Sequence, residues 1–216
     1  MADDAERGGA VSGGGDSGNA DSGGAHVTAW QRLAGKGIYP AKYAIFLLLP
    51  FRGLMLSPTR LIRRMGIGRG DAVLEIGCGP GYFSPAVARH LREGKLVLFD
   101  YQDAMLDIAE RRLRRKGLTN YERHQGDAKA LPFADASFDA AFLVTVLGEV
   151  GDPARALSEA ARVLRPGGRL SVSELTGDPD YVRFDRLKPM AEAAGLTFER
   201  RFGPRFAYTA NFVKAS

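Results

Sequence analysis

A loop with three glycines holds the residues whose types and spacing are most suggestive of chemistry. In the segment VLEIGCGPGYFS (residues 73–84), Gly77, Gly79 and Gly81 follow an apolar run that contains Glu75. Glycine costs chain entropy wherever it sits, so three at alternate positions indicate that a ligand lies against bare backbone. A helix that follows such a loop offers free N–H groups. NAD, FAD and S-adenosylmethionine are the ligands that this loop type could serve.

The spacing of the glycines separates these ligands. The dinucleotide fingerprint is G-x-G-x-x-G, whereas this loop reads E-x-G-x-G-x-G from Glu75 to Gly81. A pyrophosphate gains nothing from a carboxylate in the loop, but a ligand with an ammonium and a sulfonium group tolerates or welcomes one. The signature closely resembles motif I of the class I S-adenosylmethionine-dependent methyltransferases.

Further segments extend the resemblance in the family's order, from residue 72 to about 175. Asp100 lies 19 residues after Gly81, near the spacing of about 20 expected for a ribose-binding acid. The resemblance implies that this acid holds both ribose hydroxyls. GDAKALPFADASFD (126–139) resembles the adenine-edge motif, in which Asp127 would accept from the exocyclic amine. FDAAFLVTVLGEV (138–150) resembles the fourth-strand segment and would place Leu143 and Val144 beside the cofactor.

The resemblance therefore implies a set of cofactor-binding residues and one catalytic candidate. The chain resembles small bacterial methyltransferases similar to the ubiquinone/menaquinone-biosynthesis C-methyltransferases. Where those often carry a His-His or His-Glu pair, this chain has Gly148-Glu149. Glu149 is a candidate general base or orienting acid, and the alternative is an acid that faces solvent at the start of the next helix. No metal site is expected. The implied cofactor contacts are Glu75, Gly77, Cys78, Gly79, Gly81, Asp100, Tyr101, Asp127, Ala128 and Leu143.

The elements that must position these residues follow an alternating pattern after residue 70. Short apolar runs alternate with amphipathic stretches, which is typical of a parallel sheet covered by helices. We expect an α/β fold: a Rossmann-like, doubly wound, mostly parallel seven-stranded sheet with an antiparallel C-terminal hairpin. The expected strands are 72–76, 95–100, 121–125, 138–144 and 169–175, followed by two strands in 196–214, and the expected helices are 82–91, 104–117, 152–164 and 181–195.

Composition divides the chain into three parts. Residues 1–25 are rich in Gly, Ala, Ser and Asp and should be disordered. Residues 26–70 form a predicted basic and apolar helical lid, and residues 71–216 the S-adenosylmethionine-binding methyltransferase domain. The whole chain carries a net charge of +5 and the tail carries −4, which leaves +9 for the rest. The single cysteine, Cys78, excludes an internal disulfide framework.

The basic stretch leaves two interpretations open. Residues 22–70 contain eight Lys or Arg residues and no Asp or Glu, around the apolar run YAIFLLLPFRGLML. This stretch is either a lid packed on the domain or a surface, centred on 30–64, for weak contact with an anionic membrane. The run is too short to span a bilayer. The expected location is the cytoplasm, with peripheral membrane contact under the second interpretation.

The expected function is methyl transfer to a small acceptor, of lipophilic character if the apolar stretch lines its channel. The alternatives are a nucleic-acid or protein methyltransferase and a non-catalytic nucleotide-binding module. No nucleic-acid partner is expected, because the chain lacks the Asn/Asp-Pro-Pro-Tyr type of motif. The sequence identifies the cofactor better than the acceptor, since an already activated methyl group needs alignment more than a particular catalytic side chain.

Overall fold

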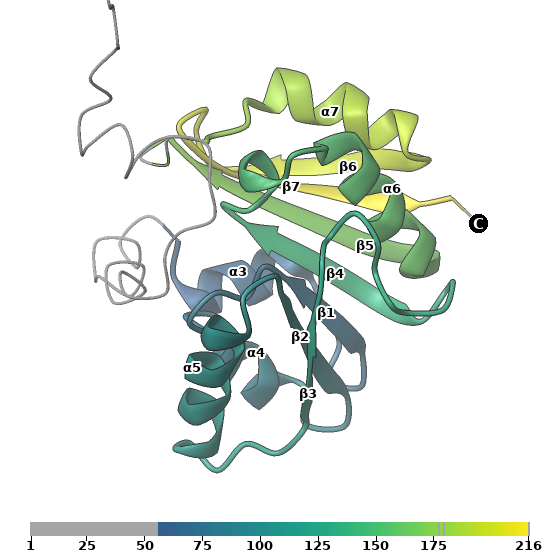
Figure 1. The fold of residues 1–216 in the computed structure, drawn as a ribbon. Helices are drawn as coiled ribbons and strands as arrows, with labels where there is room; N and C mark the ends of the chain where they lie inside the picture. Colours follow the sequence, from purple (N-terminus) through teal and green to yellow (C-terminus); the bar gives the residue numbers. More distant parts are fainter. Residues whose placement is uncertain (1–55, 177, 179, 216) are drawn as a thin grey trace, which may run out of the picture.

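The computed structural model describes residues 56–176, 178 and 180–215. The predicted tail and most of the predicted lid lie outside these residues. Within them a seven-stranded sheet has the order β3-β2-β1-β4-β5-β7-β6 (Figure 1). β1 to β5 are parallel, and β7 runs antiparallel to both β5 and β6. The predicted fold class is thus confirmed. The strands are β1 (Ala72–Ile76), β2 (Lys95–Asp100), β3 (Tyr121–Gln125), β4 (Phe138–Val144), β5 (Leu164–Leu175), β6 (Leu196–Phe202) and β7 (Ala207–Lys214).

Helices cover both faces of this sheet. Two separate apolar clusters form the core, one on each face. The central strands β1 and β4 are apolar at consecutive positions because each face packs on helices. One face carries α3 (Pro58–Met65), α4 (Ser84–His90) and α5 (Asp103–Arg114); the other carries η2 (Leu147–Glu149), α6 (Pro153–Val163) and α7 (Phe184–Ala193).

Local signals set the ends of several helices. Asp152 caps α6 by accepting a hydrogen bond from the backbone N–H of Arg155, at 3.0 Å. Ser57 caps α3 in the same way, and Gly66 ends it in the left-handed conformation. Leu61 and Met65 of α3 are buried in the core beside α4. This described end of the predicted lid therefore packs on the sheet, and no helix of the described residues is long and apolar enough to cross a membrane.

Among the predicted strands with given bounds one boundary differs, and the four predicted helices differ from the structure by one to three residues at their ends. The fifth strand begins at Leu164 rather than 169, because Leu164 pairs with Phe138 before the ladder shifts register and resumes at Arg169. The helix α6 ends at Val163, before the segment RPGG (165–168), which is an irregularity inside β5 rather than the predicted turn. A β-bulge of this kind adds residues to one strand while the pairing continues on both sides.

Candidate cofactor site

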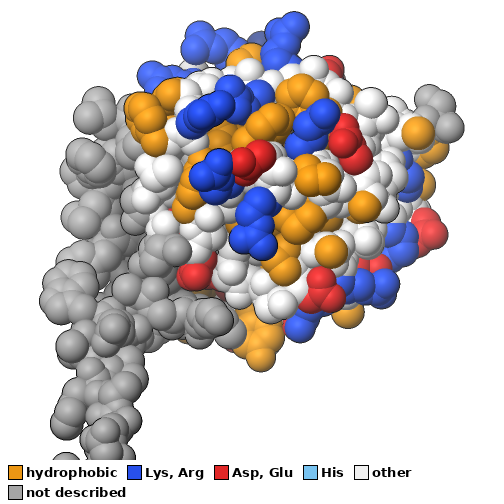
Figure 2. Space-filling model, turned by 90° about the horizontal axis from the view of Figure 1, so that it is seen from above, with side chains coloured by type: hydrophobic (Ala, Val, Ile, Leu, Met, Phe, Trp, Pro, Cys, Tyr) orange, Lys and Arg blue, Asp and Glu red, His pale blue; other side chains and the backbone are white. Residues whose placement is uncertain are grey.

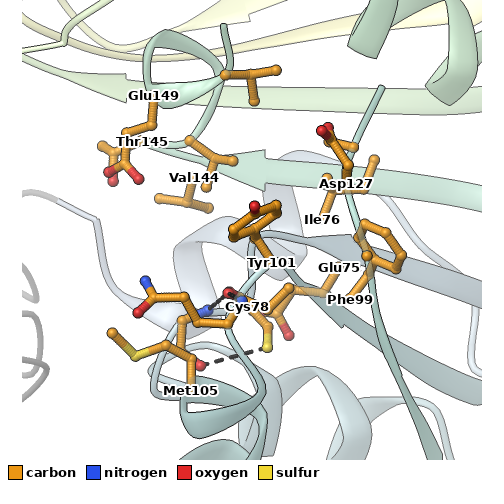
Figure 3. A pocket seen from close by; sticks show the side chains of 18 of the residues that line it. Glu75, Ile76, Cys78, Phe99, Tyr101, Met105, Asp127, Val144, Thr145 and Glu149 are labelled. Atoms are coloured by element: carbon orange, nitrogen blue, oxygen red, sulfur yellow. Dashed lines mark hydrogen bonds between the residues drawn. The ribbon is translucent and has the colours of Figure 1, made fainter. Parts of the chain in front are cut away.

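A pocket of about 330 Å³ opens where β1, β2 and β4 end (Figure 3). Because β1 pairs in parallel with both β2 and β4, the residues that follow these three strands meet at one edge of the sheet. Ligands of open α/β sheets bind at this edge. The glycine loop, the β2–α5 turn, the segment after β3 and the end of β4 all contribute to the wall.

The three glycines of the loop have different surroundings. All have positive φ angles, of 69° at Gly77, 50° at Gly79 and 71° at Gly81. A Cβ atom at Gly77 would lie 2.5 Å from a methyl of Val146, and one at Gly81 would lie 2.8 Å from the Cα of Ala109. At Gly79 no atom lies within 4 Å of the same position. Gly79 is therefore the glycine whose bare backbone is open to a ligand.

Asp100 connects the glycine loop to the β2–α5 turn. Its Oδ2 accepts a hydrogen bond from the N–H of Gly79 at 2.8 Å, and its Oδ1 accepts one from the N–H of Gln102 at 2.9 Å. Burial raises the pKa of this carboxyl, and the backbone donors oppose the rise. Each oxygen of a carboxylate can accept more than one hydrogen bond. Asp100 can thus hold the loop and still accept from two hydroxyl groups.

Glu75 is a buried carboxyl that lines the pocket. It is 3% exposed, and its Oε2 has no hydrogen-bond partner among the described residues. Burial raises the pKa of Glu75 to about 8; the nearby Ser84 hydroxyl lowers it and Asp100 raises it further. A buried acid without a partner is costly unless it binds a cation or stays protonated. This position suits a cationic group of a ligand.

The residues after β2 and β3 supply a flat surface and a polar edge. Tyr101 is 57% exposed although it is large and aromatic, and it lines the pocket. Asp127 and Ala128 also line the wall. Asp127 accepts from the N–H of Lys129 at 2.9 Å and pairs with its ammonium at 3.3 Å. An exocyclic amine would share this carboxylate with Lys129, a neighbour that the sequence analysis did not single out.

Comparisons with known proteins agree with this geometry. Residues 74–172 match the family model described as "Methyltransferase domain". A ubiquinone/menaquinone biosynthesis C-methyltransferase of Francisella philomiragia is 38% identical over 117 residues, which cover 53% of this chain and 47% of that protein. Residues 74–172 therefore form a methyltransferase domain. Matched parts span 31% to 55% of the curated relatives' own lengths.

Solved structures share the fold of this methyltransferase domain at low sequence identity. A S-adenosylmethionine-dependent methyltransferase of Aquifex aeolicus has a TM-score of 0.76 at 20% identity, covering 82% of this chain and 99% of that chain. The [4+2]-cyclase SpnF has a TM-score of 0.66 at 20% identity, covering 73% of this chain and 79% of its own. These likenesses concern the fold alone.

Two of the predicted contacts of the methyltransferase domain do not line the pocket. Leu143 is 2% exposed and packs in the core on the α6 and α7 side, whereas Phe142 and Val144 line the pocket. Alternate residues of a strand point to opposite faces, so Leu143 faces α6 and α7 while Phe142 and Val144 face the other side of the sheet. The space beside Gly81 is filled by Ala109 of α5, so Gly81 packs on this helix rather than on the pocket. The other predicted contacts line the pocket: Glu75, Gly77, Cys78, Gly79, Asp100, Tyr101, Asp127 and Ala128.

Thr145 is a pocket residue that the sequence analysis missed. It follows β4, is 6% exposed and has a φ of 53°, which is uncommon for a residue that is not glycine. Its N–H donates to the carbonyl of Ser173 at 2.9 Å, which ties this turn to β5. Strained residues of this kind cluster at functional sites. Nothing in its residue type signalled the conformation.

Glu149, the catalytic candidate of the sequence analysis, follows β4 in η2. It lines the pocket and is half-buried, so it does not simply face solvent (Figure 3). The preceding residue must be glycine, because a Cβ at Gly148 would overlap the backbone carbonyl of Asp180. The loop after β5 thus lies directly against the segment that carries Glu149.

Cys78 packs within the glycine loop. Its side chain is buried, and its Sγ lies 3.5 Å from the carbonyl of Gly79. Burial raises the pKa of the thiol well above its usual value, and the nearby acids Glu75 and Asp100 raise it further. The thiolate is the nucleophilic form of cysteine. Cys78 is therefore a small packing residue in the pocket wall rather than a nucleophile.

Proposed function

We propose that the chain transfers a methyl group from S-adenosylmethionine to a small acceptor. The observation that carries this proposal is the open backbone of Gly79 beside the Asp100 carboxylate and the unpaired Oε2 of Glu75. These groups offer space, hydroxyl acceptors and a site for a cation within one pocket. No group of three or more His, Cys, Asp or Glu side chains in the described residues could hold a metal.

The proposed roles of the residues follow from their positions. When bound, the cofactor supplies a methyl group on a positively charged sulfur that departs as a neutral thioether. Asp100 would hold the ribose hydroxyls, Glu75 the ammonium, and Tyr101 the face of the adenine. Alignment of the acceptor and exclusion of water remain the main tasks of the protein. Glu149 would act as a base only where the accepting atom must lose a proton.

The acceptor we favour is a small molecule with an apolar or aromatic body. Relatives whose name includes ubiquinone/menaquinone biosynthesis C-methyltransferase support a quinone-like ring with carbon as the accepting atom. Since the matched part is about half of those proteins, this choice rests on analogy. The same fold occurs in a [4+2]-cyclase, so a test must detect methyl transfer itself.

The decisive experiment follows a labelled methyl group. The chain is incubated with methyl-labelled S-adenosylmethionine and separate extracts of lipid, small metabolites, RNA and protein. We expect label in the lipid or small-metabolite fraction, absent from an Asp100→Ala control. Label found only in RNA or protein would instead favour a nucleic-acid or protein methyltransferase. If the chain binds the cofactor but transfers label to no fraction, the proposal that it catalyses methyl transfer is contradicted.

Contact with an anionic membrane through residues 30–64 is a separate proposal. Most of this segment, including Arg52, lies outside the described residues. Arg60 and Arg63 of α3 are exposed, whereas Arg64 donates to the Thr209 hydroxyl at 3.0 Å and so serves the fold. Each basic residue near an anionic surface contributes about 1 kcal/mol. Salt-sensitive co-sedimentation with anionic vesicles, reduced in the Arg60→Gln/Arg63→Gln variant, is expected; protein left in the supernatant at low salt would refute it.

A further inference from the structure

A second hollow, of about 420 Å³, lies on the same edge of the sheet as the cofactor pocket. It is formed by the end of β5, the start of α7 and the β6–β7 hairpin. Leu175 at the end of β5 pairs with Ala207, so the hairpin tip lies at the carboxyl edge of the parallel strands. The carbonyl of Asp180 packs against Gly148, beside Glu149. The loop that leads into the second hollow therefore touches the segment that leads into the cofactor pocket.

Positive charge dominates the lining of this second hollow. Arg183, Arg201 and Arg205 line it together with one acid, Asp185. Asp185 is already held by Arg183, through hydrogen bonds of 3.0 Å and 2.6 Å. The ion pairs of the described residues include neither Arg201 nor Arg205. Two guanidinium groups thus remain without a carboxylate at this site.

Aromatic side chains complete the hollow. The guanidinium of Arg201 lies 4.9 Å from the ring centre of Phe184, within the range of a cation–π contact. Phe206, at the hairpin tip, is 55% exposed. Figure 2 looks onto the α7 side of the molecule and shows Lys and Arg side chains interspersed with hydrophobic ones. Charge and apolar surface therefore occur side by side, as a ligand with an acidic group and an apolar body requires.

The hairpin tip is held in place rather than loosely exposed. The backbone N–H and the hydroxyl of Thr176 donate to the carbonyl of Phe206 at 2.9 Å and 3.1 Å. The Tyr181 hydroxyl donates to the carbonyl of Arg205. Burial and the nearby Glu174 carboxylate raise the pKa of Tyr181, so its phenol stays neutral and adds no negative charge. A preformed hollow of this kind binds without a large ordering cost.

We propose that this hollow binds the carboxylate or phosphate of a small amphipathic ligand through Arg201 and Arg205, with the ligand's apolar part against Phe206 and Tyr181. Resting on the proposed function, this ligand is the methyl acceptor. The residues involved lie beyond 74–172, the part that matches the family model. The family match therefore describes the cofactor half of the site, while this chain's own C-terminal segment would select an acidic acceptor.

The test measures binding of defined anions to the full chain saturated with S-adenosylhomocysteine. Phenyl phosphate and benzoate are titrated by calorimetry, with benzyl alcohol as the neutral probe. The variant is Arg201→Gln/Arg205→Gln. The single variant Arg201→Gln is compared with the matched control Arg200→Gln, which removes one charge from the same strand on the α3 side, where Arg200 lies 5.8 Å from the ring centre of Phe202.

We expect both anions to bind and the double variant to weaken them by about tenfold or more, since charge-assisted hydrogen bonds are strong. Arg200→Gln should leave both affinities within about twofold, and benzyl alcohol should bind poorly to all forms. If Arg201→Gln and Arg200→Gln lose the same affinity for the anions, the effect comes from overall charge and the proposal is overturned. The proposal is also overturned if the double variant loses no affinity.

A parallel arm distinguishes the source of the anionic group. Vesicles of phosphatidylglycerol are sedimented with the same variants. Binding to vesicles that is lost in Arg201→Gln/Arg205→Gln, without binding of soluble anions, would overturn the small-acceptor proposal in favour of a lipid headgroup. Because the probes need no methyl transfer, anion binding can be confirmed even if the labelling experiment fails, and the reverse holds as well.

Discussion

Replacement of Glu75 by glutamine tests the electrostatics of the cofactor pocket directly. Glutamine has nearly the same shape as glutamate, but it carries no charge and takes up no proton in this range. Glu75 is 3% exposed, and burial raises the pKa of its carboxyl from 4.5 to about 8. In the protein without ligand, the ionised side chain is therefore the unfavourable form, and removing the possibility of ionisation should stabilise the fold.

The sign and size of the effect follow from proton linkage. Between pH 4.5 and about 8, folded Glu75 keeps a proton that the unfolded chain has released. The free energy of unfolding therefore falls as the pH rises through this window, by about 1.4 kcal/mol per unit. At pH 7 the loss is about 3 kcal/mol, so Glu75→Gln should gain roughly that amount, or about 6–12 °C in Tm for a chain of this size. At pH 5 the two proteins should differ little.

Thermal and urea unfolding from pH 5 to pH 8.5 measure this difference. Glu159→Gln is the matched control, because Glu159 is also buried but the Arg162 guanidinium lowers its pKa. A lowered pKa gives stability that is present above the unfolded pKa and lost in acid, so the Glu159→Gln variant should be less stable than the wild type at pH 7.

The same Glu75→Gln protein should bind S-adenosylhomocysteine about tenfold more weakly at pH 8, where wild-type binding is tightest, since it lacks the charge for the ammonium. A Glu75→Gln protein that is less stable than wild type at pH 7, with an unchanged pH slope, would refute the reasoning.

Four further outcomes are expected. S-adenosylhomocysteine should raise the Tm of the wild type and NAD should not; the reverse thermal shift would contradict the cofactor assignment. Asp100→Ala should weaken cofactor binding by about 1.5–3 kcal/mol in a calorimetric titration, and unchanged affinity would remove Asp100 from the site. Gly79→Val should fold but not bind, whereas Gly117→Val, with a φ of 66° and equally open surroundings, should show similar strain and normal binding; equal binding by both would sink the steric argument. Cys78→Ala should keep most of the methyl-transfer activity in a radiometric assay, and its inactivation despite cofactor binding would show a chemical role.

Local features of the sequence were enough to predict the cofactor half of this protein. Apolar runs at regular intervals indicated the strands, and the order of elements indicated a doubly wound sheet, because each element must bury one face against the next. The glycine loop and Asp100 are recognisable by spacing, since both lie at strand ends that a parallel sheet brings together. The prediction missed the early start of β5 at Leu164, where pairing with Phe138 extends the strand through a segment of turn-forming residues.

Several features of the two hollows depend on contacts between distant segments, and only the tertiary structure could decide them. Of the three loop glycines, only Gly79 faces open space, because Val146 and Ala109 arrive from other parts of the chain. Whether Leu143 or its neighbours reach the pocket depends on which sheet face holds α6 and α7. The second hollow joins residues from β5, α7 and the hairpin, whose neighbourhood follows from antiparallel pairing rather than from spacing along the chain. Side-chain type is a local property, but burial, charge pairing and proximity are properties of the packed molecule.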